Sequence, residues 1–147
     1  MIDAMDRKIV RALNVNARQS FREIAKGLGT SATAVIRGVK KLEAAKAIGG
    51  YIPVVDAAYF GFDLTVIILL TINQGKLLET QRRIARDSHV AVVLDITGEW
   101  DSLVIANFRG RADLNIFLKR INAMAHVSRT MTNIVLNTIK NERRIPV

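Results

Sequence analysis

The sequence has no cysteine, only two histidines and no apolar run longer than nine residues. Without cysteine the chain forms no disulfide, has no thiol nucleophile and offers no thiolate to zinc. His89 and His126 are far apart in sequence, so we expect neither a metal site nor a cofactor. The longest apolar run, Leu64–Ile72, is too short for a membrane helix, which needs about 20 residues. The first residues lack the apolar stretch of a signal peptide, so a cytoplasmic location is expected.

Nucleotide-binding motifs of the GxGxxG or P-loop type are also absent. Acidic residues are the scarcer charge, with 13 Asp and Glu against 22 Lys and Arg, a net charge of +9. This excess favours a polyanionic partner, most commonly nucleic acid, although an anionic membrane surface or plain solubility would also account for it. The excess is spread along the chain, so local patterns carry more weight than the total.

Residues 20–48 form the stretch around which the chain is organised. A first helix is predicted over residues 3–14 because apolar side chains recur there every three or four positions. A second helix begins after Ser20, which forms a capping box with Glu23, and ends at Gly29.

The third helix is predicted from a cap at Thr30 or Ser31 to about Ala45. One of its faces is apolar and packs inward, comprising Val35, Val39 and Leu42. The opposite side carries Thr33, Arg37 and Lys40, with Lys41 on its flank and no acid among them. A capped helix, a glycine turn and a helix with a basic face are the parts of a helix-turn-helix DNA reader, although a basic face alone is equally often just solvated. Gly38, inside this helix, suggests close approach of another helix or of DNA.

Residues 49–61 form a connector. After it, the apolar pattern changes to that of strands and helices in alternation. Strands are predicted over Leu64–Ile72, Val90–Thr97, Trp100–Phe108 and Val127–Ile139, and helices over Lys76–Arg86 and Ala112–Ala125. This βαββαβ order is that of a ferredoxin-like unit, with two helices on one face of an antiparallel sheet. Another copy of the sheet is the simplest cover for its second face.

The predicted fold class is therefore α+β, in three segments. Residues 1–48 form a helix-turn-helix domain, residues 49–61 a strand or linker, and residues 62–147 a ferredoxin-like domain.

This arrangement resembles the Lrp/AsnC (feast/famine) family of transcriptional regulators. The resemblance rests on the segments MDRKIVRALNVNARQSFREIAKGLGTSATAVIRGVKKLE, GYIPVVD, FGFDL, TGEWD and TIKNERRIPV. It implies binding of double-stranded DNA as a homodimer, often assembled further into an octamer, and control by an amino acid or related metabolite bound in the C-terminal unit. It further implies that residues 62–147 form a RAM-type domain for oligomerisation and effector binding. The GYIPVVD segment within residues 49–61 would be a hinge strand that pairs with its copy in the partner chain.

Three positions depart from the family pattern. Gly38 stands where Arg is frequent, Lys46 where glycine usually ends the third helix, and Ala32 where proline often follows the cap. The first removes an expected DNA contact, the second predicts a different helix exit, and all three put base specificity in question.

Two sets of candidate site residues follow. For DNA binding they are Ser31, Thr33, Arg37, Lys40 and Lys41, with Arg37 suited to reading guanine and the lysines to contacting phosphates. For effector binding they are Gly98, Glu99, Trp100 and Asp101 in the hairpin turn, with Thr132 and Asn133 in the last strand. An ordinary β-turn explains the hairpin equally well. The acids near this turn are more often structural than catalytic.

The leading interpretation is a sequence-specific, ligand-responsive regulator, cytoplasmic and associated with the nucleoid, and not an enzyme. An architectural DNA-compacting protein with weak sequence preference is the first alternative. A tetrapyrrole-decarboxylase-like enzyme is the second, because some such enzymes resemble this family.

Overall fold

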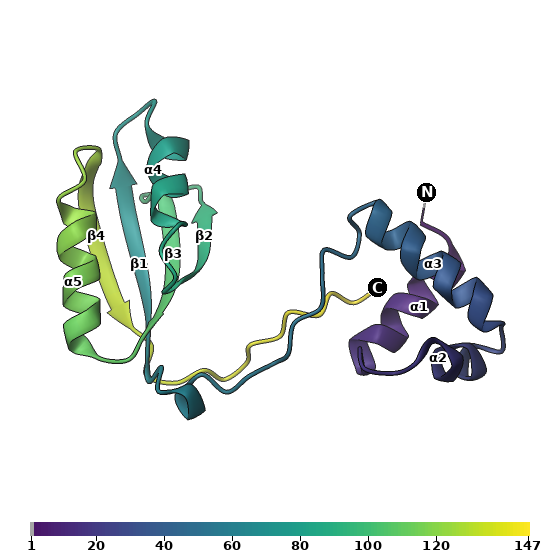
Figure 1. Ribbon diagram of the computed structural model, residues 1–147. Coiled ribbons are helices and arrows are strands. Elements are labelled where there is room, and N and C mark those ends of the chain that lie inside the picture. The colour runs from purple at the N-terminus through teal and green to yellow at the C-terminus, as the bar shows by residue number, and fades with distance from the viewer. Residues whose placement is uncertain (1) are drawn as a thin grey trace. The chain divides into compact units, whose positions relative to one another are not determined.

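The computed structural model describes residues 2–147, which fold into two compact units (Figure 1). One unit comprises the residues up to Val54 together with Asn141–Val147, and the other comprises Val55–Lys140. The tail, assigned to the C-terminal domain from the sequence, thus groups with the N-terminal unit. In the part of the chain that the structure describes, no helix combines the length and apolar character needed to cross a bilayer.

The N-terminal unit has three helices, α1 (Ala4–Val15), α2 (Phe21–Leu28) and α3 (Ala32–Ala44). Each begins at a side-chain cap: Asp3, Ser20 and Ser31 accept a hydrogen bond from the backbone N–H three residues on. The predicted capping box of Ser20 and Glu23 is present, and Asp3 and Asp6 form a second one. Gly29 ends α2 in the left-handed conformation, as predicted.

Each of the three helices contributes one stripe of apolar side chains to the core of this unit. Its fully or nearly buried members are Ile9, Leu13, Ile24, Ala25, Val35, Val39 and Leu42. Gly38 is part of this packing, because a Cβ built there would lie 2.5 Å from Cδ1 of Ile9. The glycine is therefore explained by close approach of α1, one of the two reasons that its position suggested.

Lys46 ends α3 in the left-handed conformation, which favours glycine. Its φ is +55°, its N–H donates to the carbonyl of Glu43 at 2.9 Å, and the N–H of Ala47 donates to Leu42 at 2.9 Å. This pair of bonds is a Schellman motif. The different exit expected from Lys46 is thus not found, because the lysine itself adopts the left-handed backbone.

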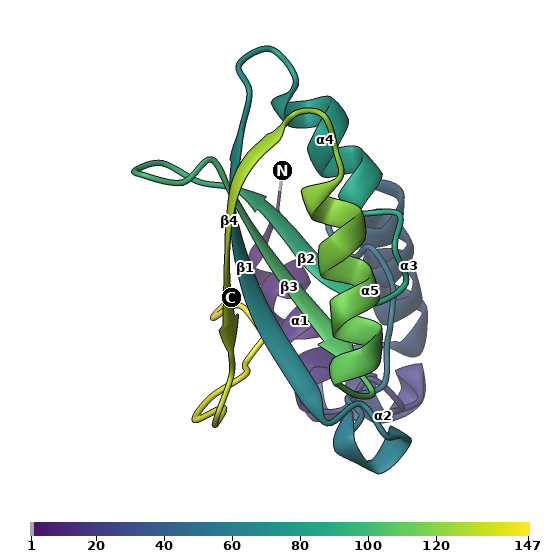
Figure 2. The ribbon, with the colours of Figure 1, turned by 90° about the vertical axis from the view of Figure 1, so that its left-hand side faces the viewer.

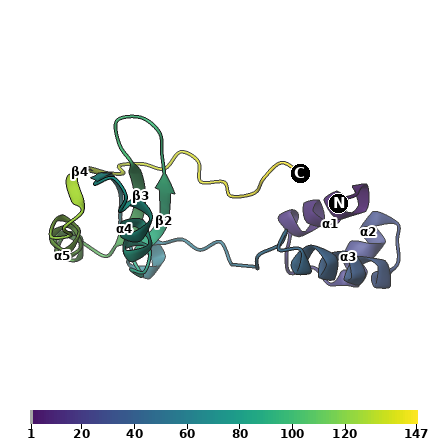
Figure 3. The ribbon, with the colours of Figure 1, turned by 90° about the horizontal axis from the view of Figure 1, so that it is seen from above.

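The C-terminal unit is the predicted βαββαβ fold. Its elements are β1 (Leu64–Ile72), α4 (Leu77–Ile84), β2 (Val90–Asp95), β3 (Ser102–Phe108), α5 (Arg111–Asn122) and β4 (Val127–Ile134), preceded by a short 3₁₀ helix, η1 (Ala58–Phe60). The sheet is antiparallel with strand order β2-β3-β1-β4. Figures 2 and 3 show both helices on the same side of the sheet.

Alternate residues of β1 and β3 face the two helices. Val66, Ile68, Leu70, Val104, Ala106 and Phe108 are fully buried against Ile84 of α4 and Leu114, Phe117 and Ile121 of α5. The residues between them on the same strands are only partly buried, because they lie on the face without helices.

The end of the last strand differs from the prediction. This strand ends at Ile134, not Ile139, because Ile134 already pairs with Val66, just after β1 begins at Leu64. Residues 51–55 have no strand partner within the described chain, and their pairing with a partner chain stays a prediction. Their side chains are exposed, and that of Val54 is fully so.

Candidate functional site

The face of α3 opposite the core carries the side chains expected to read DNA. Thr33, Arg37 and Lys40 are all exposed, on the far side of the helix from Val35 and Val39. Arg37 and Lys40 form no ion pair within residues 2–147, so their charges remain available to a ligand. Guanidinium and ammonium groups on one helix face suit the base edges and phosphates of duplex DNA.

Ser31 has a structural role as the N-cap of α3. Its hydroxyl oxygen accepts a hydrogen bond from the N–H of Ala34 at 3.1 Å. The hydroxyl proton remains free to be donated to an acceptor outside the protein. Ser31 therefore caps α3 and lies where the helix N-terminus offers unpaired amides to an anion.

Lys41 lies in a different environment from the other basic residues of α3. Its ammonium group is 2.9 Å from Oδ2 of Asp3 and 2.5 Å from Oδ2 of Asp6, which is only 2% exposed. The hydrogen bonds to Asp6 and then Asp3 raise the pKa of Lys41 above its ordinary value. The hydrogen bond from Lys41, followed by the one from the Asp6 N–H, lowers the pKa of Asp3 to about 2.

These contacts make Lys41 the counter-charge of a buried carboxylate and join α3 to the start of α1. The sequence pattern suggested a helix face without acids, and the acids that pair with Lys41 come from α1. No local pattern in the sequence indicates this pairing, because it depends on how α1 packs against α3.

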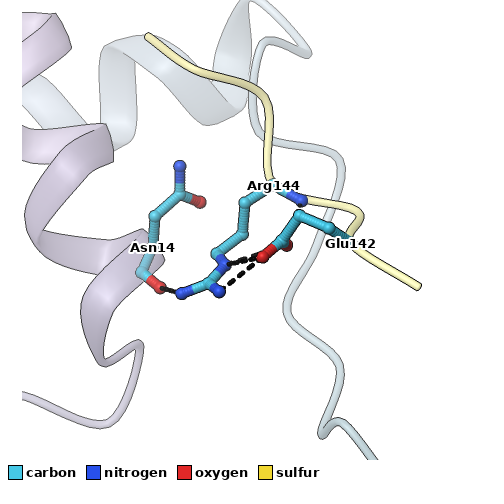
Figure 4. A network of polar contacts seen from close by, with 3 residues as sticks. All are labelled: Asn14, Glu142 and Arg144. Carbon is cyan, nitrogen blue, oxygen red and sulfur yellow. Dashed lines mark hydrogen bonds and ion pairs between the residues drawn. The ribbon is translucent and has the colours of Figure 1, made fainter. Parts of the chain in front are cut away.

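The C-terminal tail also contacts α1. Arg144 donates from Nε to both carboxylate oxygens of Glu142, at 2.9 and 3.0 Å, and from Nη1 to the carbonyl of Asn14 at 3.5 Å (Figure 4). Arg11 donates to the carbonyl of Val147. The tail therefore contacts the C-terminal half of α1. The N-terminal end of the same helix is joined to α3 through Lys41.

The hairpin between β2 and β3 holds the four residues expected to bind an effector. Gly98 has φ +119°, which favours glycine, and leaves its backbone open to solvent. Trp100 is half-buried, and the guanidinium of Arg129 on β4 lies 4.0 Å from the centre of its ring. Arg129 also forms an ion pair with Glu99. Sequence reasoning did not identify Arg129 as a candidate, because no local sequence pattern indicates that a residue of β4 contacts the hairpin.

Asp101 is engaged by the backbone. Its Oδ2 accepts the N–H of Ile72 at 2.8 Å, two residues beyond the last pair of β1 with β3, Leu70 with Ser102. The N–H of Ile72 therefore has no ladder partner on β3, and the Asp101 carboxylate satisfies it. One carboxylate oxygen of Asp101 is thus committed to the fold.

The two candidates on β4 are not brought together. Thr132 pairs with Ile68, which faces the helices, whereas Asn133 pairs with Ile67 on the other face. Residues directly opposite each other in an antiparallel pair project to the same side. Asn133 therefore shares the open face with Arg129, which lies opposite Thr71.

The histidines have ordinary surroundings. His89 bonds to Asp87 through Nδ1 at 2.9 Å and stacks on Phe108, with ring centres 4.9 Å apart. Among the residues that the structure describes, no group of three His, Cys, Asp or Glu side chains could hold a metal ion.

Comparisons with known proteins agree with both units. Residues 2–43 match the model of the AsnC-type helix-turn-helix domain, and residues 65–145 match that of the Lrp/AsnC ligand binding domain. An uncharacterised HTH-type transcriptional regulator of Pyrococcus furiosus is 40% identical over 98% of this chain and 97% of its own. The HTH-type transcriptional regulator Ptr1 of Methanocaldococcus jannaschii is 33% identical over the whole of both chains.

Solved structures give the same result. Escherichia coli AsnC superimposes with a TM-score of 0.88 over 97% of both chains at 24% identity, which shows the shared fold. A feast or famine regulatory protein from Mycobacterium tuberculosis, complexed with L-methionine, has a TM-score of 0.87 over 99% of both chains at 26% identity. With both of its domains matched and close relatives over its full length, the chain belongs to the Lrp/AsnC family of transcriptional regulators.

Proposed function

We propose that this regulator reads duplex DNA with the exposed face of α3, residues 1–48 acting as the DNA-binding domain. The supporting observation is that Thr33, Arg37 and Lys40 are exposed and have no partner within residues 2–147, on a helix capped at its N-terminus. Arg37 contacts guanine in the major groove and Lys40 contacts a phosphate. Ser31 donates to a phosphate beside the helix start. Lys41, committed to Asp6, orients the helix and adds charge near the backbone.

Footprinting on the gene's own promoter tests this proposal. A regulator gives discrete protected sites, and Arg37→Ala weakens binding to such a site more than binding to unrelated duplex, because base contacts specify and phosphate contacts do not. Lys40→Ala lowers the salt slope by about 0.9, and Lys8→Ala on the exposed side of α1 is the matched control. Equal losses on matched and unrelated duplex for Arg37→Ala would remove its assigned role.

A DNA-compacting protein is the second candidate. Gly38 favours it, because packing against Ile9 excludes a longer side chain there and leaves Arg37 as the sole guanidinium within the described helix α3. Continuous protection without discrete sites would establish that alternative.

We further propose that residues 62–147 dimerise through the open face of the sheet, with residues 49–61 as the linker. Leu94, Leu103, Leu69 and Met131 form a row across all four strands. Leu94 and Met131 are more than 40% exposed. Because water contact with such a row is unfavourable, a second copy of the same face is the simplest cover. The exposed apolar linker residues Ile52 and Val54 support pairing of the linkers as well.

Sedimentation of charge-bearing variants tests the assembly. Leu69→Glu places a carboxylate at the centre of the open face and yields monomers. Leu78→Glu on the exposed side of α4 is the matched control and leaves assembly unchanged. A dimer that persists in Leu69→Glu would show that the interface lies elsewhere.

We propose that the effector is an amino acid bound beside the hairpin. Gly98 offers a backbone N–H to its carboxylate together with the Arg129 guanidinium, and the free oxygen of Asp101 accepts its ammonium group. Asn133 lies on the same face as Arg129, whereas Thr132 lies on the face that the helices cover and is left out of the proposed site. The L-methionine complex of the mycobacterial relative supports this ligand class.

Because Trp100 is the chain's single tryptophan, its fluorescence reports directly on this hairpin. Titration with the common amino acids, methionine first, shifts its emission and raises the thermal stability. A lack of response to all of them would indicate a regulator without an amino-acid effector.

We also propose that the protein is not an enzyme and acts in the cytoplasm at the nucleoid. His89, which a tetrapyrrole decarboxylase would need as an acid or base, is held by Asp87 and stacked on Phe108, which supports a structural role. Incubation with a carboxylated tetrapyrrole should give no decarboxylated product, and its formation would restore the enzyme alternative.

A further inference from the structure

The charges of the C-terminal unit are separated by face. The segments that contain α4 and α5, residues 76–87 and 109–124, hold eight Lys and Arg against three acids, a net charge of +5. The rest of residues 55–140 holds two basic residues and five acids, a net charge of −3. Both helices lie on one side of the sheet (Figure 2), so the positive charge of this unit gathers on its helical face.

Part of this charge converges on a shallow pocket between the two helices. The pocket measures about 220 Å³, and Arg83, Arg86 and Arg120 line its rim over a floor that includes Phe117. Arg120 is fixed there by an ion pair with Asp87, and its guanidinium lies 5.4 Å from the centre of the Phe117 ring.

Arg82, Arg83 and Arg86 form no ion pair within residues 2–147. A face made only for solubility normally intersperses acids with such residues. Here Glu79, Asp87 and Asp113 offset only part of the positive charge, and Arg83 interacts with Glu79 without forming an ion pair. The excess of planar guanidinium donors suits phosphate oxygens. This charge also disfavours the same face of a second copy as the occupant, because like faces repel.

We propose that this helical face is a second, sequence-independent contact surface for duplex DNA, which binds the phosphate backbone of DNA already held by the N-terminal unit. This inference rests on the proposed function, because DNA held by α3 is presented to the C-terminal unit at a high effective concentration. Arg83 and Arg86 are the residues that donate to phosphate, and Arg120 is positioned by Asp87 to support them. DNA long enough to reach both surfaces therefore binds with more phosphate contacts than a short duplex.

The test compares full-length wild type with the double variant Arg83→Gln/Arg86→Gln on a long duplex and on a duplex that spans one α3 site. Two lost phosphate contacts lower the salt slope on the long duplex by about 1.8, so the affinity ratio of wild type to variant changes about tenfold between 50 and 200 mM salt. The short duplex shows no such difference. Arg83→Lys/Arg86→Lys retains most of the slope, and Lys140→Gln, away from the helices, leaves it unchanged.

Each outcome decides the inference. Equal slopes for wild type and the double glutamine variant on the long duplex overturn it. Unchanged DNA binding with loss of oligomers in sizing experiments overturns it too, because the face would then bind another copy. If Arg37→Ala/Lys40→Ala binds the short duplex as tightly as wild type, the proposed role of α3 fails. The salt slopes of wild type and Arg83→Gln/Arg86→Gln on the long duplex then still decide whether the helical face contacts DNA. If wild type binds neither duplex, both are overturned.

Discussion

The packing of Gly38 against Ile9 gives a quantitative test of how α1 and α3 fit together. In an open helix, replacing glycine by alanine stabilises by about 1 kcal/mol. Here the added Cβ would lie 2.5 Å from Cδ1 of Ile9, whose side chain is fully buried and cannot turn into solvent. Overpacking of this kind costs about 1 to 3 kcal/mol. We therefore expect Gly38→Ala to lower the free energy of unfolding by up to about 2 kcal/mol, the difference between these two effects.

A double-mutant cycle isolates the contact. Ile9→Val removes Cδ1 and alone costs about 1 kcal/mol. In the double variant the new methyl group occupies the vacated space and the helix gains its propensity. The two changes should then be less harmful together than their sum by about 1 to 2 kcal/mol.

Urea unfolding of the four proteins, followed by circular dichroism at one protein concentration, measures the cycle. A fixed concentration matters because the proposed dimerisation would contribute to the apparent stability. The reasoning would be refuted by a Gly38→Ala variant about 1 kcal/mol more stable than wild type, or by two changes that are simply additive.

Three further predictions concern the caps and the hairpin. Because the pKa of Asp3 is lowered from 3.8 to about 2, its charged form stabilises the folded state above pH 3.8, and this stabilisation is lost as the pH falls toward 2. In Asp3→Asn the free energy of unfolding should fall less steeply than in wild type as the pH is lowered through this range. Equal pH dependence in the two proteins would contradict this. Lys46→Gly should raise the free energy of unfolding by about 1 kcal/mol by relieving the left-handed backbone, whereas Gly29→Ala should lower it by a similar amount; a loss in Lys46→Gly would contradict the Schellman assignment. Arg129→Ala uncovers Trp100 and should shift its emission to longer wavelength, and an unchanged spectrum would show that the stacking is not maintained in solution.

The local signals in the sequence predicted the helices of the N-terminal unit closely. The capping boxes and Gly29 are short-range features, and the backbone obeys them. The βαββαβ order was also predictable, because the apolar period changes from that of helices to that of strands.

What the sequence could not supply were the contacts between distant residues. Lys41 was expected on a face without acids, but Asp6 lies beside it only because α1 crosses α3 there. Arg129 reaches Trp100 only through the register of β4 against β1. The end of β4 at Ile134 likewise depends on where its partner strand begins, which periodicity along β4 does not reveal.

The central claim is that α3 gives this family member sequence-specific DNA binding. Selection of bound duplexes from a random pool by the full-length protein, in parallel with Arg37→Ala, tests it most directly. The account predicts that wild type enriches a discrete motif containing guanine and that Arg37→Ala loses the preference at that guanine while still binding duplex. Failure of wild type to enrich any motif, or the same motif with both proteins, would contradict it.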